Sequence, residues 1–265
     1  MTALDASPEL PLLRTDAGGV ARLTLNRPRA YNSLSYALLG QLQEELARIA
    51  EDSAVRVVVL AGAGKAFCAG HDLKEMGADL RDAPVRALFD RCSAVMTALT
   101  RLPQPVIARV HGIATAAGCQ LVAACDLAVC AEDSRFATSG VKYGLFCSTP
   151  MVALSRNVAR KPAMEMLLTG DFIDAAEALR LSLVNRVVPA DGLDAAVDAL
   201  CARLLDKPPA VLALGKRAFY HQLELGLEEA YAFTTDVIVA NALGADFAEG
   251  LEAFVHKRKP RWPTT

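Results

Sequence analysis

Two stretches of this chain carry residues that could bind and activate an anionic oxygen. The first covers residues 66–76 (AFCAGHDLKEM), and the second covers residues 111–126 (HGIATAAGCQLVAACD). Small residues in the second stretch let a ligand approach the backbone. The same stretch opens a helix, whose first N–H groups have no partner within the helix and whose dipole favours negative charge. We therefore expect both stretches to present backbone N–H groups to a ligand oxygen.

The segments around these stretches indicate an α/β protein. Residues 55–60 (VRVVVL) and 105–110 (PVIARV) are short, β-branched and apolar, as is typical of strands buried on both faces of a largely parallel sheet. A turn signal at 16–19 separates two β-prone runs and predicts an N-terminal hairpin. Ser35 is a suitable N-cap for a helix that reaches Ile49. Further helices are expected at 83–101 and 116–125, followed by a strand at 127–130.

From residue 150 onward the pattern becomes mostly helical. We expect helices at 151–159, 163–168, 175–183, 191–205, 210–223 and 227–254, with an extended segment at 185–189 and breaks at Gly226, Gly244 and Gly250. No internal repeat or long linker separates independent domains. The expected organisation is a core at 1–190 that carries the ligand site and a C-terminal helical region at 191–265.

Composition argues for a small-molecule partner. The chain has 265 residues, of which 53% are hydrophobic, so it is long enough to bury a sizeable core. Its 28 basic side chains nearly balance 30 acidic ones, and no charged run offers a surface for nucleic acid. The apolar runs are too short for a membrane span, so no membrane partner is expected.

Cysteine usage and the first residues predict a cytoplasmic protein without a bound metal. Residues 1–10 have neither the apolar run of a secretory signal nor the basic residues of a transit peptide. The seven cysteines lack C-x-x-C spacing, which disfavours both a disulfide framework and a zinc site. We expect reduced, mostly buried thiols and no metal ligands.

Nucleotide binding is disfavoured by the loop that follows the strand at 55–60. Gly62 and Gly64 form a short G-x-G, but the third glycine of a dinucleotide-binding turn and the helix directly behind it are missing. The loop also lacks the G-K-S/T ending of a P-loop.

The same loop and a series of later segments resemble the enoyl-CoA hydratase/isomerase (crotonase) family. The matching blocks keep their order from about Pro11 to Trp262, which makes them more specific together than any one alone. They lie at 26–28 with Asn32, 66–67, 72–76, 105–108, 118–121, 125–126, Phe136, 144–145, 165–170, 175–183, 187–189 and 249–259.

The resemblance implies a fold, a ligand and an assembly. The fold is a crotonase-like spiral of ββα units with a helical C-terminal region for trimerisation, and the assembly is a homotrimer or a dimer of trimers. The ligand is an acyl-CoA thioester, which is the substrate, so no separate cofactor is expected. In the family two backbone N–H groups polarise the thioester carbonyl, and by position they fall on His71 and Ala117.

The resemblance also assigns residues to the coenzyme. The matched positions along the CoA moiety are Arg29, Ala30, Ala69, His71, Asp72, Leu73 and Lys74, while Phe254 and Lys257 are expected to reach the CoA of a neighbouring subunit.

The catalytic positions depart from the family pattern. Family hydratases use two glutamates, and here Gln120 and Gly140 stand in their places. An amide can orient water but cannot carry a proton at neutral pH, and glycine has no side chain. Since each positioned acid or base contributes about 10²–10⁴-fold, the loss of both should remove most of the hydratase rate.

Several functions therefore stay open. The chain is nominally a 2-enoyl-CoA hydratase, a lyase that would use the backbone donors and a water oriented by Gln120. One alternative is a catalytically impaired acyl-CoA-binding or regulatory protein, and another is isomerisation, hydrolysis or decarboxylation of a CoA thioester. The His71 imidazole is a candidate base, and Cys147 or Ser148 is a candidate nucleophile.

Overall fold

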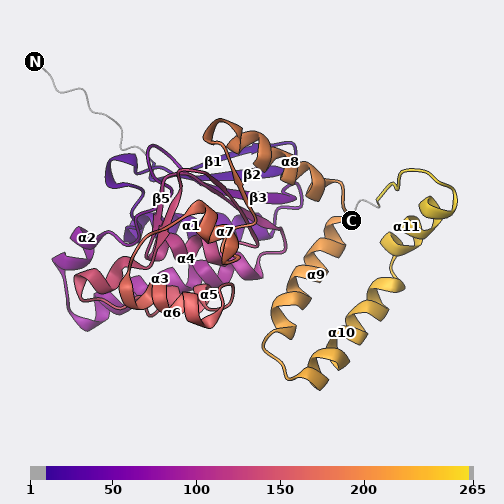
Figure 1. Ribbon diagram of the computed structural model, residues 1–265. Helices are drawn as coiled ribbons and strands as arrows, with labels where there is room; N and C mark the ends of the chain where they lie inside the picture. The colour runs from indigo at the N-terminus through magenta and orange to yellow at the C-terminus, as the bar shows by residue number, and fades with distance from the viewer. Residues whose placement is uncertain (1–9, 263–265) are drawn as a thin grey trace, which may run out of the picture.

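The computed structural model describes residues 10–262, and its central feature is a six-stranded sheet (Figure 1). The strand order is β1-β2-β3-β4-β6-β9, in which only the β1–β2 pair is antiparallel. The strands are β1 (Leu12–Ala17), β2 (Val20–Leu25), β3 (Val57–Gly62), β4 (Val106–Val110), β6 (Leu127–Ala131) and β9 (Arg186–Val188). The predicted α/β class and largely parallel sheet are confirmed.

The N-terminal hairpin forms as predicted because its turn contains two glycines. Gly18 and Gly19 have φ values of 57° and 83°. A two-residue loop that matches strand twist needs positive φ at both positions, which glycine adopts without a steric penalty. The expectation that the chain lacks a signal or transit peptide was based on residues 1–10. Of these only Leu10 lies within the described residues.

Helices cover both faces of the sheet. On one face the alternate residues Leu23, Val58 and Leu60 pack against α1 (Tyr36–Ala50), α3 (Asp82–Arg101) and α4 (Ala117–Ala124). On the other face Val57 and Val59 pack against α8 (Leu193–Leu205). This double coverage explains why the strands are almost wholly apolar. The division of the chain at residue 190 stays a prediction, and α8, which follows it, packs on the sheet.

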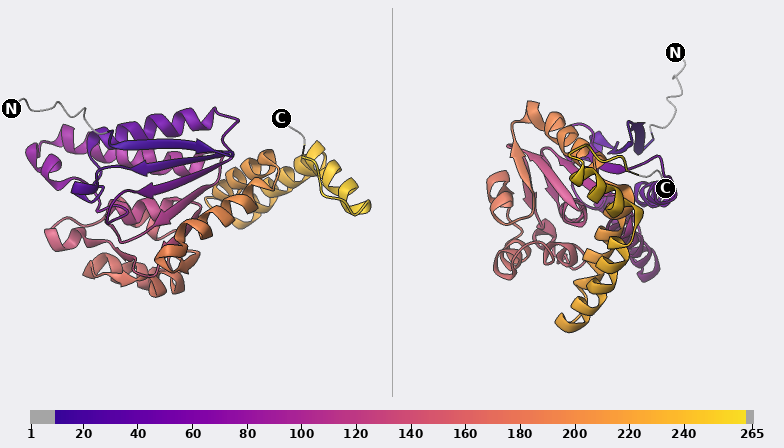
Figure 2. Two further views of the ribbon diagram at one scale, coloured as in Figure 1. Left: turned by 90° about the horizontal axis from the view of Figure 1, so that it is seen from above. Right: turned by 90° about the vertical axis from the view of Figure 1, so that its right-hand side faces the viewer.

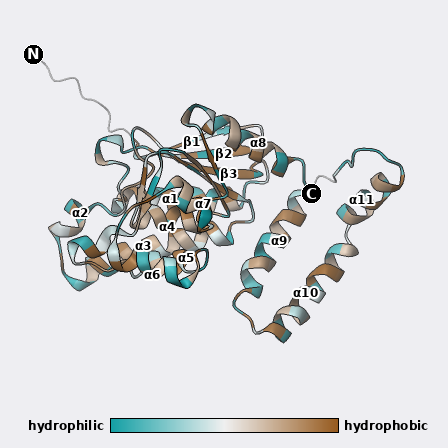
Figure 3. Ribbon diagram, in the orientation of Figure 1, coloured by the Kyte–Doolittle hydropathy of each residue, from teal (hydrophilic) through white to brown (hydrophobic). Residues whose placement is uncertain are grey.

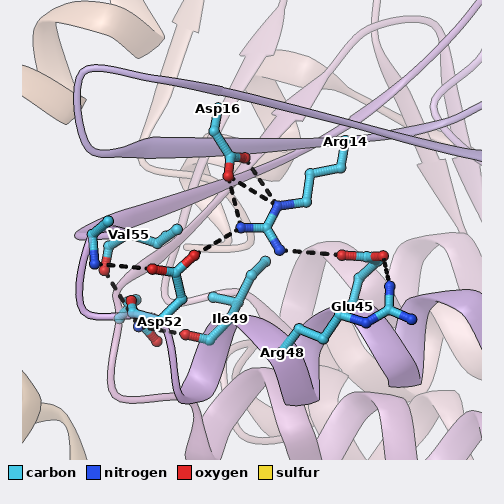
Figure 4. Close-up of polar contacts among 9 residues, drawn as sticks. Arg14, Asp16, Glu45, Arg48, Ile49, Asp52 and Val55 are labelled. Carbon is cyan, nitrogen blue, oxygen red and sulfur yellow. Dashed lines mark hydrogen bonds and ion pairs between the residues drawn. The ribbon is translucent and has the colours of Figure 1, made fainter.

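A guanidinium ties the hairpin to α1 (Figure 4). Arg14 on β1 donates to Asp16 at 2.7 Å, to Glu45 at 3.2 Å and to Asp52 at 3.2 Å. These carboxylates, led by Asp16, hold the pKa of Arg14 above its usual range. Ser35 caps α1 as expected, since its hydroxyl accepts the Leu38 N–H at 3.2 Å.

A second, smaller sheet was not predicted. It joins β5 (Ile113–Thr115), β7 (Arg135–Ala137) and β8 (Ile173–Asp174). Strands of two or three residues are too short to show a periodic hydrophobic pattern.

The boundaries of three later helices differ from the predictions. The helix expected at 151–159 is α5 (Pro150–Leu154), after which the chain leaves the helical path before α6 (Arg160–Thr169). We placed the start of α6 after Pro162, but proline is tolerated in the first turn of a helix, where its missing N–H needs no partner. The helix expected at 175–183 is the shorter α7 (Ala175–Arg180).

The last three helices project away from the sheet (Figures 1 and 2). They are α9 (Pro209–Gln222), α10 (Leu227–Ala242) and α11 (Ala245–Val255). The predicted breaks at Gly226 and Gly244 are confirmed as the N-caps of α10 and α11. The break at Gly250 is wrong, because this glycine lies inside α11, where isolated glycines are tolerated. Across residues 10–262 no helix combines the length and apolar character needed to cross a membrane.

Candidate functional site

The two stretches singled out in the sequence lie side by side. Cys68 and Ala114 form a parallel β-bridge. The Cys68 N–H donates to Ile113 O at 3.1 Å, and the Thr115 N–H donates to Cys68 O at 3.0 Å. These two hydrogen bonds fix the loop before α2 (Leu73–Ala78) against the entrance to α4.

A buried asparagine holds the first of these loops in place. Asn32 has 0% exposure, and its Nδ2 donates to Ala63 O at 2.8 Å and Ala66 O at 2.7 Å. Its Oδ1 accepts the Arg27 N–H at 2.9 Å. The buried amide group is therefore satisfied at both ends, and it joins the turn around Arg27 to the loop that contains Ala63 and Ala66.

The His71 N–H is left free by its strand pairing. Leu34 donates to Gly70 O at 2.7 Å and accepts the Asp72 N–H at 3.0 Å, so the intervening His71 points its own N–H away from Leu34. Within the part of the chain that the structure describes, this N–H donates no hydrogen bond.

Among residues 10–262 the Ala117 N–H also donates no hydrogen bond, because Ala117 is the first residue of α4. Its N-cap is Ala116, which has φ 50° and ψ −118° and donates its own N–H to Ala137 O at 3.0 Å. A non-glycine residue in such a conformation stores about 1–3 kcal/mol of strain, and strain of this kind clusters at functional sites. An added Cβ at Gly70 would lie 3.4 Å from Ala117 N, so the two donor segments are in contact.

A cavity of about 290 Å³ adjoins both donors. Its wall includes Ala69, His71, Ala116 and Ala117 from the two loops. The rest of the lining comes from Leu73 of α2, Phe89 of α3 and residues from η2 (Ser139–Tyr143) to the start of α5, namely Ser139, Gly140, Tyr143, Leu145, Phe146, Cys147, Ser148, Thr149 and Pro150. The space is mostly apolar, as expected of a small-molecule site.

The His71 ring is neutral at physiological pH. Burial lowers its pKa to about 4, and its ring stacks edge-on against Phe89 with centroids 4.9 Å apart. The buried Nε2 has no hydrogen-bond partner among the residues that the structure describes. An imidazole with so low a pKa is a weak base, so this environment favours the backbone role of His71 over the side-chain role.

We expect the His71 ring to make the fold sensitive to acid. The unfolded chain binds a proton at this ring below pH 6.5, whereas the folded chain does so only near pH 4. Stability should therefore fall as the pH drops from 6.5 to 4, by up to about 3 kcal/mol. His71→Gln keeps the backbone N–H and should reduce this fall by that amount in urea unfolding curves. Equal pH dependence in both proteins would contradict the expectation.

Cys147 is a poor candidate for the nucleophile. Burial raises the pKa of its thiol, and its Sγ accepts the Gly140 N–H at 3.4 Å. A reactive cysteine needs a lowered pKa in an electropositive setting. All seven thiols are free and buried, as the sequence predicted.

The two positions that match the catalytic glutamates are not equivalent. Gly140 lines the cavity, but Gln120 does not, and it is only 4% exposed with an unpartnered Oε1. A Cβ at Gly140 would lie 2.3 Å from Leu145 O, so the backbone itself occupies the place of a side chain. No carboxylate lines the cavity among residues 10–262, and no group of three His, Cys, Asp or Glu residues there could hold a metal ion.

The residues assigned to the coenzyme are only partly brought together. Ala69 and Leu73 line the cavity, whereas Arg29, Ala30, Asp72, Lys74, Phe254 and Lys257 do not. Asp72 has a structural role as the N-cap of α2 and as the ion-pair partner of Arg27 at 2.8 Å. Phe254 is 81% exposed on α11.

Sequence reasoning missed several large side chains that line the cavity. Phe89 belongs to the middle of α3, where its spacing matches that of ordinary core residues. Tyr143, Leu145 and Phe146 lie in a segment without regular periodicity. A cluster of three large apolar residues in such a segment was the available signal.

Comparison with known proteins decides the family. The model of the enoyl-CoA hydratase/isomerase family matches residues 15–265. The chain belongs to the enoyl-CoA hydratase/isomerase family. Its crotonase-like fold follows from solved structures: an enoyl-CoA hydratase from Mycobacterium smegmatis superposes with a TM-score of 0.94 and 55% identity, covering 96% of this chain and 99% of that one.

A group of vertebrate family members is also similar. Human enoyl-CoA hydratase domain-containing protein 3 has a structure with a TM-score of 0.91 and 42% identity, covering 95% of this chain and 100% of that one. The Xenopus laevis protein of the same name, described as mitochondrial, is 45% identical over 92% of this chain and 83% of its own length.

These relatives overturn the expected cytoplasmic location. The rat and human proteins are likewise named mitochondrial. Our expectation rested on composition and on residues 1–10, and neither reports directly on the compartment in which a folded enzyme works.

Proposed function

We propose that this family member binds an acyl-CoA thioester and polarises its carbonyl between the His71 and Ala117 N–H groups. The observation that carries the proposal is the pair of unpaired backbone donors beside one apolar cavity. Preorganised donors of this kind are each worth roughly 3–4 kcal/mol when negative charge develops on the oxygen.

We further propose that glutamate-type hydration is absent or very slow. Hydration of a 2-enoyl thioester needs one group to take a proton from water and another to deliver a proton to the α-carbon. The cavity wall offers a neutral imidazole, a protonated thiol and hydroxyl groups in their place. We therefore favour an acyl-CoA-binding protein with impaired hydratase activity over an efficient hydratase.

Binding and turnover can be separated in one set of measurements. Purified protein is titrated with crotonyl-CoA by calorimetry, loss of the enoyl absorbance is followed in parallel, and a thiol reagent detects released CoA. We expect binding without rapid loss of absorbance. Efficient hydration would favour the hydratase reading, and CoA release would favour hydrolysis. No binding of crotonyl-CoA would contradict the proposal.

We expect Gln120→Glu alone to restore no hydratase activity. The new carboxylate would be buried off the cavity wall, and Gly140 has no room for its partner. A buried carboxylate without partners should also cost several kcal/mol of stability or take up a proton. The absorbance assay tests the hydratase activity and urea unfolding tests the stability, with Gln120→Leu as the uncharged control. A tenfold gain in hydration would contradict the expectation.

We also propose that the protein self-associates through its projecting helices, as a homotrimer or a dimer of trimers. Figure 3 shows hydrophobic bands along α10 and α11. Leu243 is 84% exposed and Phe254 is 81% exposed, which is unusual for large apolar side chains. Sedimentation of the purified protein tests the assembly.

In such an assembly Phe254 and Lys257 would lie near a neighbouring subunit's CoA. Arg29, Ala30, Asp72 and Lys74 would follow the CoA moiety outside the cavity.

A further inference from the structure

We propose that the cavity accepts an uncharged acyl group and rejects one that ends in a carboxylate. This inference rests on the proposed function, because it concerns the acyl part of the same CoA thioester. It names a substrate class that the family alone does not define.

The cavity wall carries no charge at neutral pH. Its ionisable side chains are His71, Tyr143 and Cys147. Burial keeps the imidazole and the thiol in their neutral forms. Its large apolar lining side chains include Leu73, Phe89 and Phe146.

Two charged residues next to the wall have ion-pair partners elsewhere. Asp72 pairs with Arg27 at 2.8 Å, and Lys142 pairs with Asp171 at 2.7 Å. No lysine or arginine is among the lining residues of the described chain, so the cavity wall itself offers no cation to a carboxylate.

The hydroxyl groups of the wall do not replace a cation. Ser139 Oγ is 2.8 Å from Thr115 Oγ1, and Ser148 Oγ donates to Phe146 O at 3.3 Å. Thr149 Oγ1 is buried without a partner and offers a single donor. An ionised carboxylate has two oxygens that each accept several hydrogen bonds in water, so one hydroxyl compensates little of its desolvation.

These observations predict opposite effects of two acyl groups of equal length. Each methylene that the apolar wall removes from water should tighten binding about fourfold. A terminal carboxylate should remain in water instead, which leaves its acyl chain outside the cavity. Pentanoyl-CoA and glutaryl-CoA both carry five acyl carbons and differ at the far end, where one has a methyl group and the other a carboxylate.

The test is a calorimetric titration of the full chain with CoA, pentanoyl-CoA and glutaryl-CoA. We expect pentanoyl-CoA to bind at least tenfold more tightly than CoA, and glutaryl-CoA to bind no more tightly than CoA. Equal affinity of the two acyl-CoAs, both above that of CoA, would overturn this inference and leave the proposed function intact. If neither acyl-CoA binds more tightly than CoA, the proposed function and this inference both fail.

A variant provides an independent readout. Leu145 lines the cavity and is 42% exposed, so Leu145→Arg should fold while it adds a cation to the wall. We expect it to tighten glutaryl-CoA binding at least tenfold without improving pentanoyl-CoA binding. Leu223, 54% exposed and outside the cavity, gives the matched control Leu223→Arg, which should change neither affinity. An equal gain in both variants would contradict a role for the cavity.

Discussion

Gly118→Ala is expected to abolish acyl-CoA binding and to lower the free energy of unfolding by about 3 kcal/mol. The Cβ that alanine adds would lie 2.1 Å from Cys68 O and 2.8 Å from the Cys68 carbonyl carbon. That oxygen accepts the Thr115 N–H at 3.0 Å and so belongs to the bridge that aligns the two donor segments. The clash is between a Cβ fixed to the α4 backbone and the backbone carbonyl of Cys68, and neither can rotate away. The two donor segments must therefore move apart.

Gly77→Ala is the matched control for this substitution. Gly77 lies in α2 with nothing within 4 Å of an added Cβ, so alanine should stabilise the protein by about 0.5–1 kcal/mol through its better helix propensity. The two variants should therefore differ in the free energy of unfolding measured in urea and in the crotonyl-CoA affinity measured by calorimetry. Normal binding by the Gly118 variant would show that the alignment of the donors is unimportant.

Lys216→Met is expected to cost about 3–5 kcal/mol of stability, because it leaves Asp126 buried without its cation. Lys216 Nζ lies 2.6 Å from Asp126 Oδ2 and donates to Leu99 O at 2.8 Å and Gln104 O at 3.0 Å. Burial dominates both groups, since it raises the pKa of Asp126 and lowers that of Lys216. Tyr220 of α9 also donates its hydroxyl to Asp126 Oδ1 at 2.9 Å, so two polar side chains of α9 converge on this carboxylate.

An exposed lysine provides the control, because its substitution removes the same charge from an ion pair that is not buried. Lys207 pairs with Asp206 at 3.5 Å, and the two side chains are 55% and 45% exposed. Lys207→Met should change the free energy of unfolding by less than about 0.5 kcal/mol. Similar losses in both lysine variants would mean that the buried pair contributes no more than a surface pair.

The central strands and α1 could be predicted from the sequence because burial imposes a pattern on them. Val57 and Val59 face one helical layer while Val58 and Leu60 face the other, and a continuous apolar run is the direct result. Strands β5, β7 and β8 were missed because they are held by pairing with distant segments rather than by their own composition. Asp126 accepts the Val106 N–H at 2.7 Å, a contact that joins the end of α4 to the start of β4.

Of the candidate site, only the two backbone N–H donors could be predicted from the sequence. His71 and Ala117 were assigned from local motifs, and the structure leaves both N–H groups free. The rest of the cavity wall depends on where α3 and the segment after η2 come to lie, which is a tertiary property. The 2.3 Å approach of Leu145 O to a Cβ at Gly140 likewise cannot be read from sequence, although it decides whether glutamate can be restored.

The most direct test of the carbonyl-binding claim is a crystal structure of the protein with crotonyl-CoA bound. We expect the thioester oxygen to accept hydrogen bonds from the His71 and Ala117 N–H groups at about 2.7–3.1 Å. The acyl chain should then lie in the cavity against Phe89. A thioester oxygen out of reach of both N–H groups, with the acyl chain elsewhere, would contradict the account.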